Sequence, residues 1–199
     1  MLLIKNFKCC NSSITLNFTS MEKKEDSVIS QTQNWIREVV IGLNFCPFAR
    51  KPFTDQRIAY RVSDAADIDT ALVALRVMCL TLIEQPELET ALIILPEGFQ
   101  DFESYLELVY AAEDLIEDED FEGVYQVASF HPDYLFAGSD ENDPANYTNR
   151  SPYPMLHILR EDLLEIAIDK HPDTAGIPDQ NIAKARSLGL EYFRKMKFD

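Results

Sequence analysis

The chain has 199 residues, of which 46% are hydrophobic and 26% charged, and its formal net charge is −16. These values are typical of one soluble globular domain that can bury a core without disulfides or a metal. The negative charge argues against nucleic acid or an anionic membrane surface as the main partner, because both bind basic surfaces, and no apolar run reaches the roughly 20 residues of a membrane span.

Residues 1–20 differ from the rest of the chain. Met21 opens the stretch MEKKEDSV, in which charged residues precede a helix cap, as at a natural start. We therefore expect residues 1–20 to be a disordered or mis-started N-terminal extension and residues 21–199 to form a single globular α/β domain. The first ten residues are too short and too interrupted by Lys for a signal peptide. We expect a cytoplasmic protein with reduced cysteines.

Helix and strand patterns alternate through the middle of the chain. Apolar residues recur at the helical period in residues 27–44, 67–85 and 101–118. Strand formers dominate residues 57–63, 90–96 and 124–130. The order strand, helix, strand, helix, strand predicts an α/β fold with a small, mainly parallel sheet and right-handed crossovers.

The remaining elements complete this prediction. One helix is expected from Ser151, with Pro152 in its first turn, to about Asp169, and another from about Pro178 to about Met196. A fourth strand is expected at residues 134–136, antiparallel at an edge of the sheet. The predicted fold is therefore a sheet of three to four strands covered by about five helices.

The stretch from Phe130 to Pro154 has no helical period. Such long irregular segments are usually functional or disordered, and its aromatic residues argue against disorder. Ligands of open parallel sheets bind at the carboxyl ends of the strands. This stretch begins at one such end, and Ser63, Asp64 and Glu97 follow the other two strands. We therefore expect a site where these segments meet.

Catalytic candidates lie at the same edge. His131 would act as the general acid or base, because its ordinary pKa lies near neutrality, and Asp133 or Glu97 would orient it. Cys46 would serve as a nucleophile paired with His131 or as a wall of the site. The alternative for Cys46 is a small buried hydrophobic residue, as free cysteines often are.

An anion site is a second prediction for this edge. Arg150 stands just before a predicted helix, and helix N-termini attract anions. Pro152 and Pro154 each remove a backbone donor there, so Arg150 itself would hold the anion. The alternative is that Arg150 pairs with an acidic neighbour. The predicted ligand-binding residues are Arg150, Asn146, Asn149, Ser151 and Tyr134.

A metal site is an alternative that the sequence supports weakly. His131 and Asp133, joined by Asp64, Glu97 or His157, would offer ligands to a divalent ion. No strong metal-binding spacing is present, so we assign no metal ligand. The alternative for His157 is a core or helix-face position without a role. The sequence identifies no cofactor and no oligomeric state.

Three stretches resemble a known family. IGLNFCPFA (residues 41–49), VASFHPDYLFAG (residues 127–138) and NYTNRSPYPMLHILRE (residues 146–161) are similar to the bacterial family called domain of unknown function 1415. The resemblance covers nearly all of residues 28–196. It implies a soluble, mostly single-domain protein with homologues in bacteria and plants. It implies no activity and no catalytic residues.

Two functions follow from these observations. The first is an enzyme that acts on a small anionic metabolite at the carboxyl edge of the sheet, with a His/Asp pair and an arginine clamp. The second is a non-catalytic module that binds a small molecule, or a protein through the acidic helix within residues 101–122. In that case His131 and Asn146 would hold the irregular segment by bonding its backbone.

Overall fold

The computed structural model describes residues 12–198, and side chains from residue 21 onward. Its sheet has four strands in the order β1-β2-β4-β3. They are β1 (Ile58–Val62), β2 (Thr90–Ile94), β3 (Tyr125–Phe130) and β4 (Met155–Arg160). Strand β1 pairs in parallel with β2, whereas β4 is antiparallel to both of its neighbours. The α/β class is confirmed, but the sheet is mixed and not mainly parallel.

Strand β4 accounts for two errors of the sequence prediction. The helix expected from Ser151 is instead β4 followed by α5 (Glu161–Asp169), and no strand forms at residues 134–136. Strand β4 lies in the centre of the sheet and is apolar towards both faces, so it lacks the alternation that identifies a half-buried strand. A short apolar run of this kind cannot be distinguished from a buried helix by its period.

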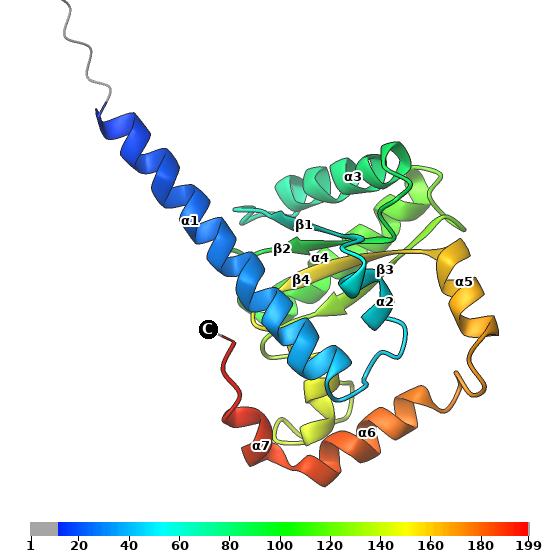
Figure 1. The fold of residues 1–199 in the computed structure, drawn as a ribbon. Helices are drawn as coiled ribbons and strands as arrows, with labels where there is room; N and C mark the ends of the chain where they lie inside the picture. Colours follow the sequence, from blue (N-terminus) through cyan, green and yellow to red (C-terminus); the bar gives the residue numbers. More distant parts are fainter. Residues whose placement is uncertain (1–11, 199) are drawn as a thin grey trace, which may run out of the picture.

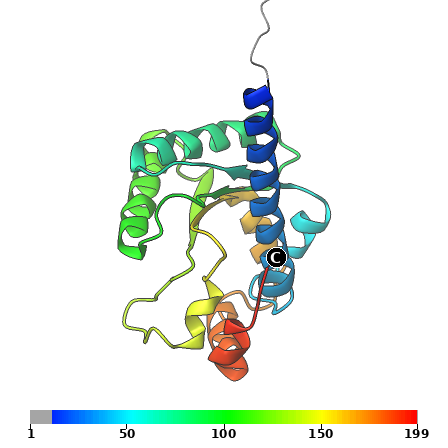
Figure 2. The ribbon, with the colours of Figure 1, turned by 90° about the vertical axis from the view of Figure 1, so that its left-hand side faces the viewer.

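Helices cover both faces of the sheet (Figures 1 and 2). The described residues contain seven α-helices, one π-helix (η1) and one 3₁₀-helix (η2). The α-helices not yet given are α1 (Ser12–Trp35), α2 (Arg50–Thr54), α3 (Ile68–Glu84), α4 (Phe102–Asp118), α6 (Ile177–Leu188) and α7 (Leu190–Arg194). The π-helix η1 (Ile36–Ile41) continues α1, and the 3₁₀-helix η2 (Pro144–Thr148) precedes β4.

The starts of two helices can be compared with the predicted ranges. Asp67, the first residue of the predicted range 67–85, caps α3 and accepts a hydrogen bond of 2.9 Å from the N–H of Thr70. Ser27 does not cap a helix, because α1 begins at Ser12 and runs through it. Residues 12–20 of the predicted extension therefore belong to α1, while residues 1–11 lie outside the described residues.

Two apolar cores lie on opposite faces of the sheet. Helices α3 and α4 pack on one face, against side chains such as Ala91 and Ile93 of β2. Helix α1 and η1 pack on the other, against Leu92 and Ile94 of the same strand. Figure 2 shows the two helices and α1 on opposite sides of the sheet. The alternation follows from the period of two residues along a strand, and burying a leucine or isoleucine side chain stabilises the fold by roughly 2 kcal/mol.

Tyr105 of α4 fastens the ends of two strands. Its hydroxyl donates a hydrogen bond of 2.6 Å to the carbonyl of Met155 in β4 and accepts one of 3.0 Å from the N–H of Phe130 in β3. The ring is fully buried, and this burial raises the pKa of the phenol well above its usual range. One side chain therefore satisfies two backbone groups at the edge where the irregular segment begins and ends.

We expect Tyr105→Phe to destabilise the protein by about 1–3 kcal/mol, because the backbone groups of Phe130 and Met155 lose a buried partner. Urea unfolding followed by circular dichroism would measure the change. Tyr110→Phe is a matched control, since Tyr110 is 62% exposed on the same helix. Equal stability of the two variants would contradict a role for the Tyr105 hydroxyl.

Candidate functional site

The carboxyl ends of β1, β2 and β3 lie at one edge of the sheet. Strand β4 is antiparallel to both β2 and β3, so these two strands run in the same direction although they are not neighbours. The backbone joins the two limbs of the irregular segment at this edge: the N–H of His131 donates to the carbonyl of Asn149, 3.2 Å away, and the N–H of Ser151 donates to that of His131, 3.4 Å away. Three of the predicted residues, His131, Asn149 and Ser151, therefore lie together at this edge.

Both ring nitrogens of His131 are occupied within the protein. Nε2 lies 2.9 Å from the carbonyl oxygen of Phe99, and Nδ1 accepts a hydrogen bond of 3.0 Å from the N–H of Asp133. Nε2 therefore carries the proton of a neutral ring. The side chain is fully buried beside the rings of Phe102 and Tyr105, and burial lowers its pKa. In this arrangement His131 holds the backbone of the loops on either side of it.

The side chain of Arg150 also bonds to backbone groups of the irregular segment. Its Nε donates to the carbonyl of Tyr134, 3.1 Å away, and its Nη2 to that of Glu141, 3.2 Å away. The guanidinium also lies 4.8 Å from the ring centre of Tyr147. These acceptors are carbonyls and not the acidic neighbour of the alternative interpretation, and the anion clamp stays a prediction.

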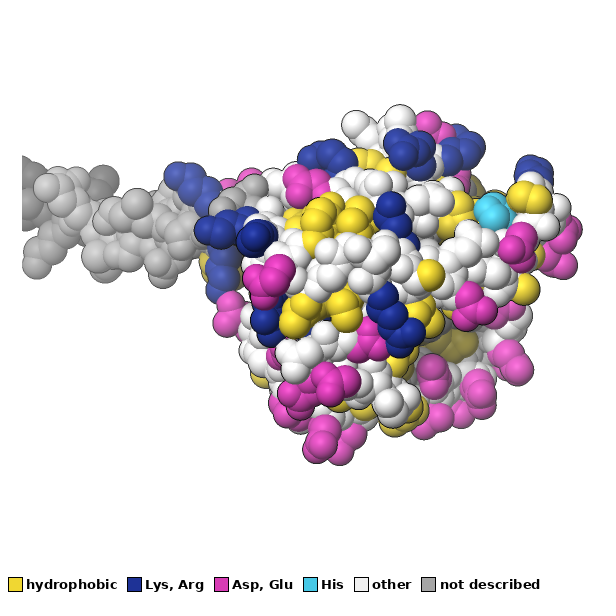
Figure 3. All heavy atoms as spheres, turned by 90° about the horizontal axis from the view of Figure 1, so that it is seen from below, with side chains coloured by type: hydrophobic (Ala, Val, Ile, Leu, Met, Phe, Trp, Pro, Cys, Tyr) yellow, Lys and Arg dark blue, Asp and Glu magenta, His cyan; other side chains and the backbone are white. Residues whose placement is uncertain are grey.

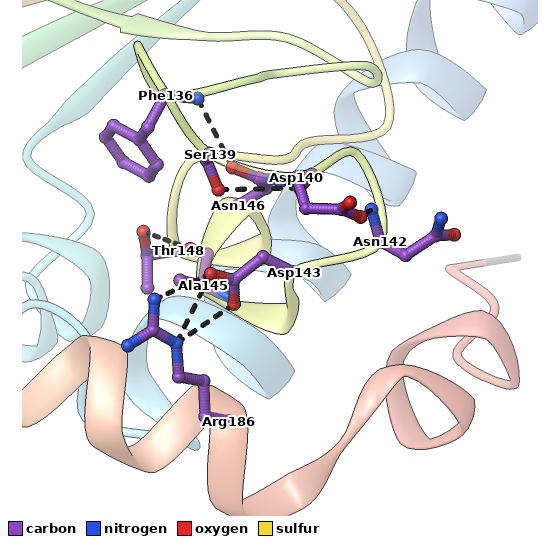
Figure 4. Close-up of polar contacts among 9 residues, drawn as sticks. All are labelled: Phe136, Ser139, Asp140, Asn142, Asp143, Ala145, Asn146, Thr148 and Arg186. Atoms are coloured by element: carbon purple, nitrogen blue, oxygen red, sulfur yellow. Dashed lines mark hydrogen bonds and ion pairs between the residues drawn. The ribbon is translucent and has the colours of Figure 1, made fainter.

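The predicted amide and hydroxyl ligands likewise bond to backbone groups. Asn146 is fully buried, and its Oδ1 accepts from the N–H of Phe136 while its Nδ2 donates to the carbonyl of Asp140 (Figure 4). The Nδ2 of Asn149 donates to the carbonyl of Ser129 at 3.2 Å. Ser151 donates to the carbonyl of Tyr153 at 2.6 Å. These polar side chains replace the regular backbone pairing that the segment lacks.

The remaining candidates of this edge are dispersed. Glu97 is exposed and pairs with Lys24 of α1, and the ring of Tyr134 lies 5.2 Å from that of Phe102. Asp133 is exposed, and its backbone N–H rather than its carboxylate meets His131. Within residues 21–198, no three side chains of His, Cys, Asp or Glu approach closely enough to hold a metal ion.

An ion pair that the sequence did not indicate anchors the segment to α6. The carboxylate of Asp143 accepts hydrogen bonds of 3.1 and 2.6 Å from Nε and Nη2 of Arg186, and one of 2.9 Å from the N–H of Ala145 (Figure 4). These bonds, first of all those from Arg186, lower the pKa of Asp143 to about 2. Asp143 thus caps η2 and ties it to a helix more than 40 positions along the chain.

An apolar cavity of about 300 Å³ lies on the opposite part of the sheet, on the face of α1. We call it the sheet-face cavity. Its floor lies near the amino ends of β1 and β2, and its lining includes Ile58, Thr90, Leu92, Ala128, His157 and Leu159 from the four strands. Its walls come from the end of α1, η1, α2, α5 and residues 42–49 between η1 and α2, which we call the Cys46 connector. They include Trp35, Val40, Phe48, Pro52, Leu163 and Ala167. Neither His131 nor Arg150 lines it.

His157 projects from β4 into this cavity. Its Nε2 lies 2.7 Å from Oγ1 of Thr90 on the adjacent strand. The ring lies deep in the protein, and this burial lowers the pKa of His157 to about 4, yet part of its surface remains accessible. A neutral imidazole therefore borders the cavity. The interpretation of His157 as a helix-face residue was wrong, because it lies on a strand.

Cys46 borders the sheet-face cavity and a second cavity. The second cavity, of about 390 Å³, is lined partly by α6, and Val40, Cys46 and Phe130 border both. Asn149 is the other predicted site residue that lines it. Cys46 is half-buried, and burial raises the pKa of its thiol, which disfavours the nucleophilic thiolate. Its position fits the predicted wall of a site better than the predicted nucleophile.

Comparison with known proteins identifies a family. A family model described as protein of unknown function (DUF1415) matches residues 27–195. No curated protein and no solved structure is similar to the chain. Among the described residues, no helix is both long and apolar enough to pass through a lipid bilayer. Figure 3 views the molecule from the side of α6 and α7, where acidic side chains are spread along the rim and apolar ones lie in small groups.

Two variants of Asp143 separate its roles. We expect Asp143→Ala to lower the free energy of unfolding by about 1 kcal/mol more than Asp143→Asn does, because asparagine still caps a helix whereas alanine does not. Both variants lose the charge on the partner of Arg186. Urea denaturation of the two proteins would measure the difference, and equal losses would show that the cap on Ala145 contributes nothing.

Stability should depend on pH through His157. Because folding lowers its pKa from 6.5 to about 4, the unfolded chain binds more protons between these values, and stability falls as the pH drops through this range. We expect a loss of about 2 kcal/mol between pH 7 and pH 5 that the His157→Phe variant does not show. Urea unfolding at both pH values tests this. His131, whose pKa is also lowered, titrates in both proteins and cancels in the comparison. The same pH dependence in both would refute the assignment.

Proposed function

This chain belongs to the DUF1415 family, whose description states no function, and we propose that it binds a small, largely apolar molecule in the sheet-face cavity. The observation that carries the proposal is the cavity itself. It is concave, almost wholly apolar, and interrupted by few polar groups, which is the usual composition of a small-molecule site. Its volume of about 300 Å³ lies at the lower end of the range for such sites, and so favours a small ligand.

The elements around the cavity support binding. The π-helix η1 contributes Ile36 and Val40 to the wall. Such segments are rare and occur often at functional sites. They distort the helix, and here the distortion lies between α1 and the Cys46 connector, where it shapes the wall.

Helix α5 supports binding in a different way. It contributes Leu163, Leu164 and Ala167 to the cavity, yet none of its residues is buried. Its outward side exposes apolar surface too, with Ile166 49% exposed. A helix that covers a cavity without entering the core opens at low free-energy cost, because few buried contacts hold it. Opening of α5 would admit a ligand to a cavity that is partly enclosed.

The enzyme predicted from the sequence receives less support than binding. Both ring nitrogens of its acid-base residue, His131, are bonded to backbone groups of Phe99 and Asp133, and Nε and Nη2 of its anion clamp, Arg150, donate to carbonyls of the irregular segment. Acid-base catalysis would require His131 to release one of these bonds. The sheet-face cavity offers a neutral histidine and a thiol with a raised pKa, and neither is poised to attack a substrate. Binding without catalysis needs no such rearrangement.

A cavity-filling variant tests the proposal. Ala128 of β3 lines the cavity next to His157, its partner in the register of β3 and β4. Ala128→Phe should therefore fill the cavity and weaken binding at least about tenfold, while the fold persists. Trp35, the single tryptophan of the chain, borders the cavity, and its fluorescence would report binding of a panel of one- and two-ring aromatic and cycloaliphatic compounds.

The control variant is Ala183→Phe, an exposed position of α6 that lines neither cavity, which should bind like the wild type. Circular dichroism would establish that both variants fold. Binding that survives in Ala128→Phe, or the absence of any response to the panel in the wild-type protein, would overturn the proposed function.

A further inference from the structure

The hydrogen bonds around Thr90 fix the protonation of His157. The hydroxyl oxygen of Thr90 lies 2.5 Å from the carbonyl oxygen of Ile158 and 2.7 Å from Nε2 of His157. A carbonyl oxygen only accepts, so the single hydroxyl proton of Thr90 must point to Ile158. Nε2 of His157 must then carry a proton and donate it to Thr90. In the neutral ring, this leaves Nδ1 with a free lone pair.

Nδ1 faces space that a ligand can enter. Within the described residues, no group donates a hydrogen bond to Nδ1, and no buried side-chain nitrogen or oxygen lacks a partner. Nδ1 must therefore lie at accessible surface. The ring borders the sheet-face cavity and is packed in the protein on its other sides, so this surface belongs to the cavity.

The other charged groups at the cavity are already engaged. Glu89 accepts from Arg57 and Lys51 at 2.8 and 3.3 Å. Arg160 donates to the carbonyls of Leu88 and Leu82. The carboxylate of Glu89 is thus paired with two cations, and the guanidinium of Arg160 lies 5.9 Å from the ring centre of Tyr125, in the core on the opposite face of the sheet. The cavity therefore presents Nδ1 of His157 as an uncharged, free acceptor at its floor, on a largely apolar surface.

We infer that the ligand of this cavity is an uncharged apolar molecule bearing a hydroxyl or ring N–H, and that it donates this hydrogen to Nδ1 of His157. The inference rests on the proposed function and names the class of ligand. A hydrocarbon would leave Nδ1 without a partner once water is excluded, and a ligand that only accepts would place two lone pairs against each other. A carboxylate would meet the same repulsion and would also lose its hydration in an apolar site.

Two probes of the same shape test the inference. 2-Naphthol and 2-methylnaphthalene differ in one position, where a hydroxyl replaces a methyl group, and equilibrium dialysis would give the affinity of each. We expect His157→Phe to lower the affinity for 2-naphthol, relative to that for 2-methylnaphthalene, by roughly three- to tenfold compared with the wild-type protein. 2-Methoxynaphthalene, which only accepts, should show no such shift.

A spectroscopic measurement on the wild-type protein does not depend on the folding of the variant. The ¹⁵N resonance of His157 Nδ1 should move upfield when 2-naphthol is added and stay in place with 2-methylnaphthalene, because accepting a hydrogen bond shields that nitrogen. The resonances of His131 and His171 serve as internal references.

The outcomes separate the two proposals. If both probes bind, their affinity ratio is the same in wild type and His157→Phe, and the Nδ1 resonance does not move, the ligand class is wrong while binding in the cavity stands. If neither probe binds the wild-type protein, the inferred class of ligand is contradicted. If the wild-type protein also fails to bind any compound of the wider panel, the proposed function is contradicted too.

Discussion

The position of β4 between β2 and β3 is the constraint on which the rest of the structure depends. Tyr105 holds the end of β3 and the start of β4 through one hydroxyl, and His131 exchanges backbone hydrogen bonds with Asn149 and Ser151 just beyond them. The chain leaves the sheet at this edge and must return to the same edge to place β4 antiparallel to its neighbours. Without β4, the sheet would lose its centre and the sheet-face cavity would lose His157.

The polar residues of the irregular segment make this return possible. A chain that leaves a sheet for two dozen residues exposes backbone groups that no neighbouring strand can satisfy, and buried groups of this kind are costly. Asn146, Arg150 and His131 each bond to two backbone groups of the segment or its surroundings. Asp143 adds the tie to Arg186. These side chains satisfy the backbone groups of the segment, as strand pairing does elsewhere in the fold.

This role explains why the sequence located the segment but favoured catalysis there. Residues that hold a loop by bonding its backbone are of the same types as residues that bind a substrate. In the sequence, a histidine between strand formers and an acidic residue is therefore the same for a catalytic and a structural histidine. What separates them is whether the ring nitrogens are occupied, and that depends on Phe99, which lies 32 positions earlier. The geometry agrees with the alternative in which His131 and Asn146 bond backbone groups.

The same limits decide how much of the fold was predictable. The elements from β1 to β3 were found because each has a clear period and bounding residues, such as Asp67 at the start of α3. Strand β4 was missed because Pro152 and Pro154 imitate a helix start and MLHILR is apolar towards both faces. Once β4 was read as a helix, His157 could not be placed beside Thr90, since that neighbour exists only in the antiparallel register.

The location of the cavity follows from the connections between strands. Both crossovers, through α3 and α4, pack on one face, so the other face is left to α1, η1 and the later helices. Helix α1 covers the part near Ile94 and Met155, whereas the part near Thr90 is bordered by the end of α1, η1, the Cys46 connector, α2 and α5. None of these fills the space above a strand whose inward residue there is an imidazole rather than a larger apolar group. An incompletely filled face, with one unpaired acceptor at its floor, is a poor way to stabilise a fold and a good way to bind a small molecule with a single donor.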